Sequence, residues 1–215
     1  VAMRPKTGEI VAMVGGRTTG ATLAMMQIFE DARIPFISLA GAIQIGVSSR
    51  PLNEAESNAG AVAVEYGRTP FVFATAAASK VTAITTQNLV DYYAGKDEAW
   101  PDGTKLRLVL RPIGDADSET IKSMSPAMRE AKSAAEQRKG MAFMVTDQEA
   151  ASAIENVPGA LGPSTLALLL SEKRALKALA LDGVVPSAQT VANGRYPLNR
   201  QMLIVTGPKT PPEAR

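Results

Sequence analysis

The chain has 215 residues, of which 46% are hydrophobic and 20% charged, a composition typical of one large globular domain or two small lobes. It contains neither histidine nor cysteine, which excludes disulfides, imidazole or thiolate metal sites, a cysteine nucleophile and a Ser-His-Asp triad. The net charge of +2 comes from 23 basic and 21 acidic residues mixed along the chain, and only 5% of residues are aromatic, so nucleic acid is not an expected partner.

The first forty residues predict a strand, a glycine-rich turn, a helix and a second strand, a unit that builds parallel sheets. In order, these elements are residues 9–14, 15–20, 21–32 and 34–39. The turn reads Gly-Gly-Arg-Thr-Thr-Gly, and its backbone N–H groups suit an anion, with Gly16, Thr18 and Thr19 as candidate ligand contacts. It lacks the lysine of a P-loop and the full dinucleotide-binding spacing, so close packing of the turn explains its glycines equally well.

Strands and helices continue to alternate through the rest of the chain, which predicts the α/β class. The expected strands are residues 42–48, 71–78, 106–111, 141–145, 158–162 (a turn with a short strand), 175–181 and 196–206. The expected helices are a short one after Asn53, then residues 85–93, 119–128, 124–138, 146–156 and 186–193. Capping boxes predict two of the helix starts, at Asn53 and Thr146. Residues 166–170 are expected to be buried.

The stretch 106–118 carries the most chemistry. Alternation predicts a strand that ends at Arg111, because the proline that follows has no N–H for the ladder. Asp115, Asp117 and Ser118 then supply turn and N-cap chemistry for the next helix. An arginine at a strand end beside a helix start is an anion-binding arrangement, since guanidinium donors and backbone N–H groups converge there. The alternative is a surface arginine near an ordinary capped helix.

Seven short motifs occur in an order and spacing that are specific together, although none is decisive alone. They are Gly-Ala-Ile-Gln-Ile-Gly-Val-Ser-Ser-Arg-Pro-Leu (41–52), Leu-Val-Asp-Tyr-Tyr-Ala-Gly-Lys (89–96), Trp-Pro-Asp-Gly (100–103), Leu-Arg-Pro (110–112), Pro-Gly-Ala-Leu-Gly (158–162), Leu-Asp-Gly-Val-Val-Pro-Ser (181–187) and Asn-Gly-Arg-Tyr-Pro-Leu (193–198). With these motifs, residues 41–208 resemble the periplasmic phosphate-type solute-binding proteins of bacterial ABC transporters.

The resemblance implies a two-lobe periplasmic-binding-protein-like fold (type II), with residues 1–74 and 176–215 in the first α/β lobe and residues 75–175 in the second. Such proteins hold an oxyanion between their lobes with hydroxyls, backbone N–H groups and one arginine, without a metal or cofactor. The resemblance implies ligand-binding roles for Arg111, Ser48, Ser49, Ser118 and Asp115, and more loosely for Gly16, Thr18 and Thr19. Where the family often has Ser-Gly-Thr, this chain has Asp-Ala-Asp-Ser (115–118).

The implied function is a non-catalytic receptor that presents phosphate or a related small oxyanion to an ABC transporter permease. Such a protein is periplasmic or otherwise exported, and the first residues, which lack a signal-peptide core, fit a mature form. Two alternatives remain open: a scaffold that keeps the fold but has lost the ligand, and an enzyme with Ser49 or Ser118 as nucleophile. An aspartate at position 115 or 117 favours phosphate over sulfate, because hydrogen phosphate has a proton to donate.

The opening segment departs from the family pattern. Residues 34–42 run almost directly into the third strand, so the family's second helix is missing. Residues 21–42 are more similar to the first unit of branched-chain amino-acid-type binding proteins, which suggests a chimera, a natural recombinant or a trimmed sequence. An incomplete first lobe exposes apolar sheet surface, which predicts a homodimer or weakened stability.

Overall fold

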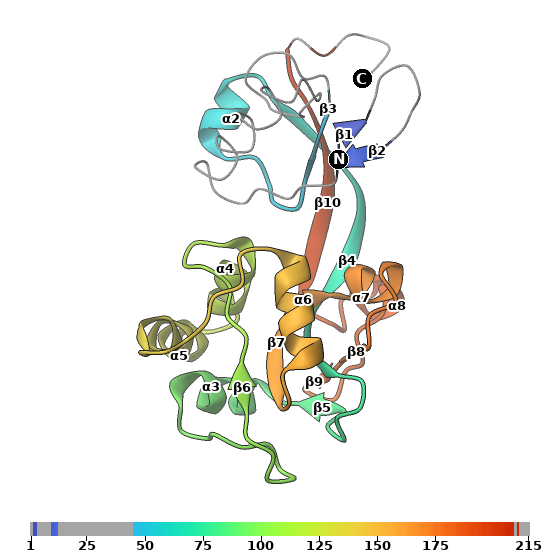
Figure 1. The fold of residues 1–215 in the computed structure, drawn as a ribbon. Coiled ribbons are helices and arrows are strands. Elements are labelled where there is room, and N and C mark those ends of the chain that lie inside the picture. Colours follow the sequence, from blue (N-terminus) through green and yellow to red (C-terminus); the bar gives the residue numbers. More distant parts are fainter. Residues whose placement is uncertain (1, 4–9, 13–44, 209, 211–215) are drawn as a thin grey trace. The chain divides into compact units, whose positions relative to one another are not determined.

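The protein divides into two compact units in a computed structural model (Figure 1). The described residues are 2–3, 10–12, 45–208 and 210. Residues 1–68 and 201–215 form the first unit, and residues 69–200 form the second. The missing helix and the branched-chain-type opening predicted for residues 21–42 lie outside the described residues.

The unit boundaries differ from those expected at residues 74 and 176. Strand β8 (Leu176–Ala178) pairs antiparallel with the end of β4 (Val62–Ala76), with Ala178 opposite Ala74. The segment that the sequence analysis assigns to the first lobe after residue 175 therefore builds the second unit as far as Arg200.

The first unit contains short strands and one short helix. Its elements are β1 (Ala2–Met3), β2 (Ile10–Ala12), β3 (Ile45–Ser48), α2 (Glu54–Asn58), the first part of β4 and the last part of β10 (Asn199–Thr206). Strand β10 pairs antiparallel with β3, and β1 pairs antiparallel with β2. Helix α2 begins with the predicted capping box, in which Asn53 and Glu56 each bond the other's backbone N–H.

The main sheet of the described residues is mixed, and most of the opening unit, for which a parallel sheet is predicted, lies outside them. Its strand order is β3-β10-β4-β7-β6, with β8 also paired to β4. The remaining strands are β5 (Ala83–Ile84), β6 (Arg107–Leu108), β7 (Ala160–Thr165) and β9 (Ala180–Leu181). Strand β7 is antiparallel to β4 and parallel to β6, and β5 is parallel to β9. Strands β7 and β8 both pair antiparallel with β4. Antiparallel neighbours do not require the long crossover connection that parallel strands need.

Helices surround the sheet of the second unit. They are α3 (Thr86–Ala94), α4 (Ala116–Ser123), α5 (Pro126–Gln137), α6 (Asp147–Asn156), α7 (Leu166–Ser171) and α8 (Ala188–Ala192). Helix α5 packs against α3 and α4, and α6 packs against β7 (Figure 1). Every helix among the described residues is too short or too polar to cross a membrane.

The core of the second unit lies between this sheet and the helices. Phe71 and Phe73 on β4 meet edge to face with their ring centroids 5.9 Å apart, and both are buried. Tyr93 of α3 and Leu110 are fully buried in the same cluster. These side chains fix β4 and the segment after β6, which ends in Arg111.

Several elements differ from the sequence prediction, and β4 begins at Val62 although the strand was expected from residue 71. Residues 141–145 form no strand, and only Phe143 makes an isolated parallel bridge, to Leu110. The apolar run 166–170 belongs to the helix α7, which begins after its N-cap Thr165. This helix lies at the surface, with Leu169 buried and Leu170 69% exposed. Ser125 caps α5 separately from α4, so the overlapping stretches 119–128 and 124–138 are two distinct helices.

Candidate functional site

Arg111 is the buried centre of the candidate site. The strand leading to it is shorter than predicted, since β6 ends at Leu108, but the pairing continues through Val109, whose N–H donates to Leu161 O at 2.8 Å. Arg111 follows with only 1% of its surface exposed. The alternative of a surface arginine is therefore wrong.

Among the described residues, three carboxylates and one carbonyl meet the Arg111 guanidinium. Nη2 lies 3.3 Å from an oxygen of Asp115 and 3.3 Å from an oxygen of Asp147, and Nε lies 3.3 Å from an oxygen of Asp117. Nη1 donates to the Met144 carbonyl at 2.8 Å. A planar guanidinium has donors on several edges, and here Nη1 and Nη2 donate hydrogen bonds to the Met144 carbonyl and to Asp115 Oδ2.

Asp115 combines two roles at the start of α4. Its Oδ1 accepts from the Asp117 N–H at 2.9 Å, which makes it the N-cap, while Oδ2 faces Arg111. Gly114 precedes it with a φ of +78°, a left-handed conformation that glycine adopts without strain, and this turn brings the carboxylate back toward the strand end. Capping and charge pairing therefore coexist in the Asp115 side chain.

Ser118 lies in the same cluster but holds the backbone. Its hydroxyl donates to the Arg111 carbonyl oxygen at 3.1 Å, and the residue is fully buried. The bond joins the first turn of α4 to the end of the strand. Ser118 therefore fixes the position of Arg111 relative to the helix start.

Arg200, near the start of β10, is a second buried arginine in this cluster. Its guanidinium forms an ion pair with Asp117, and its Cζ lies 5.7 Å from the centroid of the Phe71 ring. Asp117 thereby contacts two arginines, through Oδ1 to Arg200 and Oδ2 to Arg111. With all groups ionised, two arginines face three aspartates, which leaves an excess of one negative charge among these five side chains.

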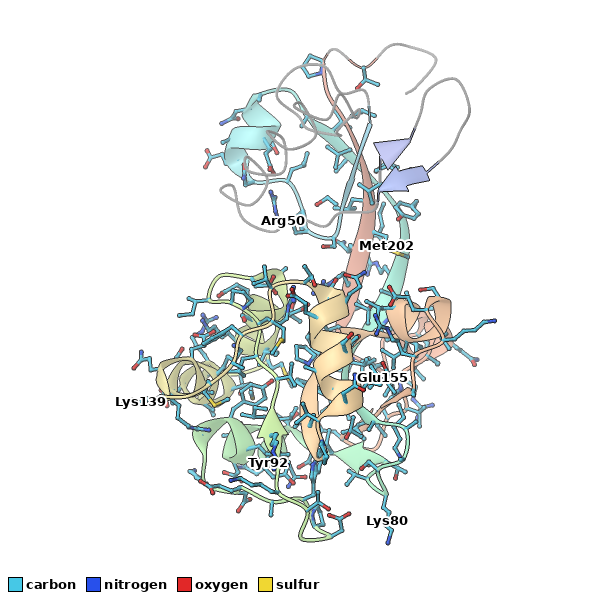
Figure 2. The ribbon with its side chains drawn as sticks, in the orientation of Figure 1. Arg50, Lys80, Tyr92, Lys139, Glu155 and Met202 are labelled. Carbon is cyan, nitrogen blue, oxygen red and sulfur yellow. The ribbon has the colours of Figure 1, made fainter. Side chains whose placement is uncertain are left out.

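Ser48 and Ser49 belong to the first unit, where β3 ends. The Ser48 hydroxyl donates to the Arg50 carbonyl at 2.8 Å and accepts from the Arg50 N–H at 3.2 Å, so it shapes the turn. Arg50, labelled in Figure 2, is held by Glu56 through two bonds of 2.8 and 2.6 Å. Both serines are half-buried. The remaining candidates, Gly16, Thr18 and Thr19, lie outside the described residues.

Comparison with known families identifies the fold. The family of PBP superfamily domains matches residues 17–215, which is most of the chain. The chain belongs to the PBP superfamily. The match includes much of the opening segment that the sequence analysis sets apart.

Relatives of this PBP-superfamily protein include phosphate-binding proteins. The phosphate-binding protein PstS of Borreliella burgdorferi is 23% identical over 224 residues, which covers 94% of this chain and 80% of the relative. A protein from Clostridium perfringens, described as a phosphate ABC transporter substrate-binding protein and solved with bound phosphate, has a TM-score of 0.63 at 22% identity, over 80% of this chain and 69% of its own. An ABC-type phosphate transport receptor from Vibrio cholerae has a TM-score of 0.56 at 16% identity, over 92% and 87%. The resemblance to phosphate-type solute-binding proteins and the α/β fold are confirmed.

Two residues of the Arg111 cluster escaped the sequence analysis. Asp147 occupies the first turn of α6, which begins with the capping box of Thr146 and Glu149. Acidic residues are common in the first turn of a helix, so the sequence gives Asp147 no further role. Arg200 lies in strand β10. The one signal in the sequence is its place in the alternation of that strand, which puts its side chain on the buried face. Its register depends on pairing partners far away in the sequence.

A surface hollow elsewhere in the second unit is separate from this cluster. It has a volume of about 270 Å³ and is lined by Lys122, Ser123, Ser125, Pro126, Arg129 and Glu130. Lys122 is bound to Glu136 at 2.9 Å, and Ser125 caps α5. No group of three or more potential metal ligands occurs within the described part of the chain.

Proposed function

We propose that this protein is a non-catalytic receptor that binds phosphate or a related small oxyanion and delivers it to the permease of an ABC transporter. The observation that carries the proposal is Arg111, a buried guanidinium at a strand end beside the start of α4, at the position that the family motif Leu-Arg-Pro assigns to the oxyanion. The named phosphate-binding relatives support the same ligand class. A receptor of this class works in the periplasm or otherwise outside the cytoplasm.

The ligand set we propose contains Arg111 and Asp115 of the second unit, Ser48 and Ser49 of the first unit, and the turn residues Gly16, Thr18 and Thr19. Ser118 contributes by holding the Arg111 backbone, given its hydrogen bond to that carbonyl. Among the described residues, carboxylates outnumber guanidinium groups around Arg111, which favours an anion that carries its own proton. Hydrogen phosphate has such a proton at neutral pH, whereas sulfate has none.

Titration calorimetry with inorganic phosphate and with sulfate tests this proposal. We expect phosphate to bind at least about tenfold more tightly than sulfate. Hydrogen phosphate can donate a hydrogen bond to the carboxylate, whereas sulfate has no proton to donate. Asp115→Asn is expected to reduce the preference for phosphate over sulfate. Asparagine is an equally good N-cap, so α4 is expected to begin at the same residue in this variant. Equal affinity for both anions contradicts the phosphate assignment. The absence of heat from either anion favours the scaffold that has lost its ligand.

The enzyme alternative finds little support in the second unit. The Ser118 hydroxyl is fully buried and donates its proton to the Arg111 carbonyl, so it is neither accessible nor donating to a base. Without histidine, a serine nucleophile needs a lysine as base. Turnover of a phosphoester would separate an enzyme from a receptor.

A homodimer remains a prediction, supported by exposed apolar side chains in the first unit. On β4, Val62, Val64 and Tyr66 alternate and are more than half exposed. We expect sedimentation equilibrium to detect a dimer, and Val64→Lys to shift it toward monomer by placing a charge on this face. Val185→Lys, at an equally exposed valine of the second unit, is the matched control. A monomer at all concentrations contradicts the prediction.

A further inference from the structure

The three carboxylates around Arg111 differ in their access to solvent. The side chains of Asp115 and Asp117 are 4% and 3% exposed, whereas that of Asp147 is 36% exposed. The guanidinium itself is buried. An anion that bonds to Arg111 must therefore replace a group that now covers it, and Asp147 is the acidic group that reaches both the guanidinium and solvent.

Asp147 is fixed at this place by its own helix. It is the first residue of α6, directly after the N-cap Thr146, whose hydroxyl accepts from the Glu149 N–H at 3.1 Å. Glu149 in turn accepts from the N–H groups of Val145 and Thr146. These bonds hold the helix start without the Asp147 carboxylate, whose oxygen lies 3.3 Å from Arg111 Nη2.

A carboxylate oxygen in this position accepts the same kind of hydrogen bond as an oxygen of phosphate or sulfate. Two anions at one guanidinium edge compete for its donors and repel each other. We propose that the Asp147 carboxylate competes with the bound oxyanion for Arg111 and thereby sets the affinity of the site. This inference rests on the proposed function and adds to it a residue that weakens binding.

Asp147→Asn tests the inference in calorimetry with inorganic phosphate. The variant removes the competing charge and keeps an amide of the same shape, and we expect the Kd to fall about fivefold or more relative to wild type. Asp147→Ser is a second variant with the same expectation, in case the amide itself bonds to Arg111. Melting temperatures without anion check that both variants fold.

Glu155→Gln is the matched control, since it removes one negative charge from the same helix (Figure 2). Glu155 pairs with Arg174 at 3.4 Å and lies outside the Arg111 cluster. Its Kd is expected to stay within about twofold of wild type, because distant sites act independently. An equal gain in Glu155→Gln would mean that net charge alone matters, and would overturn the inference.

The outcomes separate this inference from the proposed function. Wild type that binds phosphate, with unchanged or weaker binding in both Asp147 variants, overturns the role of Asp147 and leaves the receptor proposal intact. Binding by the variants but not by wild type supports Asp147 as a competitor strong enough to close the site. No binding by any of them overturns both proposals.

Discussion

Arg111→Ala is expected to lower the free energy of unfolding by about 3–5 kcal/mol, because it leaves buried carboxylates without this partner. Asp115 and Asp117 are almost fully buried, and both lie 3.3 Å from the guanidinium. Removing one member of a buried charge network costs more than the network contributes, since the remaining charges stay out of water. Urea unfolding followed by circular dichroism measures the loss.

Arg107→Ala is the matched control for this experiment. Arg107 lies on β6, shortly before Arg111, is exposed, and its side chain donates one hydrogen bond to the Pro158 carbonyl at 2.7 Å. Its loss is expected to cost no more than about 1 kcal/mol. Similar losses in the two variants would show that the Arg111 network does not carry the stability assigned to it here.

Because Arg111→Ala is expected to destabilise the fold, a different variant of Arg111 is needed to measure phosphate binding. Arg111→Lys keeps a positive charge near the carboxylates but has a single nitrogen in place of the fork. We expect it to fold and to weaken phosphate binding about tenfold or more. Weak binding in this folded variant is the more informative result, because it cannot be attributed to unfolding.

Local signals in the sequence predict the helix starts well. The capping boxes at Asn53 and Thr146 form as predicted, and Thr85 caps α3, which ends at Gly95. Gly95 has a φ of +75°, the left-handed conformation that closes a helix. Each of these features depends on residues within one or two turns, so the sequence contains the whole signal.

Strands and apolar runs are harder to predict because their partners are distant. Residues 106–111 alternate as a strand should, yet only Arg107 and Leu108 form β6. The extent of β6 depends on its pairing with β7, whose partner residues are Ala160 and Leu161. The run 166–170 is too short for its periodicity to separate a helix from a buried strand. Thr165, whose hydroxyl caps α7, was the overlooked signal.

The site illustrates the same limit. The stretch 106–118 contains Arg111 and its contacts Asp115, Asp117 and Ser118, which are close in sequence. Their partners Asp147 and Arg200 come from α6 and β10, which only the fold brings to Arg111. A buried ion-pair network assembled from distant elements has no local signature.

A second buried charge network, between α4 and α5, leads to the other large effect. Lys132 is fully buried, and its Nζ donates to Glu136 at 2.9 Å. Lys122 reaches the other oxygen of the same carboxylate, also at 2.9 Å. Burial lowers the pKa of Lys132, and the hydrogen bond to Glu136 offsets part of that effect. Burial raises the pKa of Glu136, but the hydrogen bonds from Lys122 and Lys132 outweigh it, so this pKa lies below its usual value.

Glu136→Ala is therefore expected to lower the free energy of unfolding by about 3–5 kcal/mol at about pH 7, since Lys132 loses its carboxylate and stays buried. Lys132→Met combined with Glu136→Leu is expected to recover most of that loss, because apolar side chains of similar volume replace the buried ions. Failure of the double variant to recover stability would mean that Glu136 acts mainly through Lys122.

The pH dependence of the Glu136→Ala loss provides an independent check. Without Glu136, the pKa of Lys132 in the folded protein falls further below its unfolded value, because a partner that raises it is gone. Between the two pKa values the unfolded chain binds more protons, so stability rises with pH in that window. Urea unfolding at about pH 7 and at about pH 9.5 should thus show a smaller deficit at the higher pH, where folded Lys132 is closer to neutral. A deficit that grows with pH would contradict a buried, charged Lys132 as its cause.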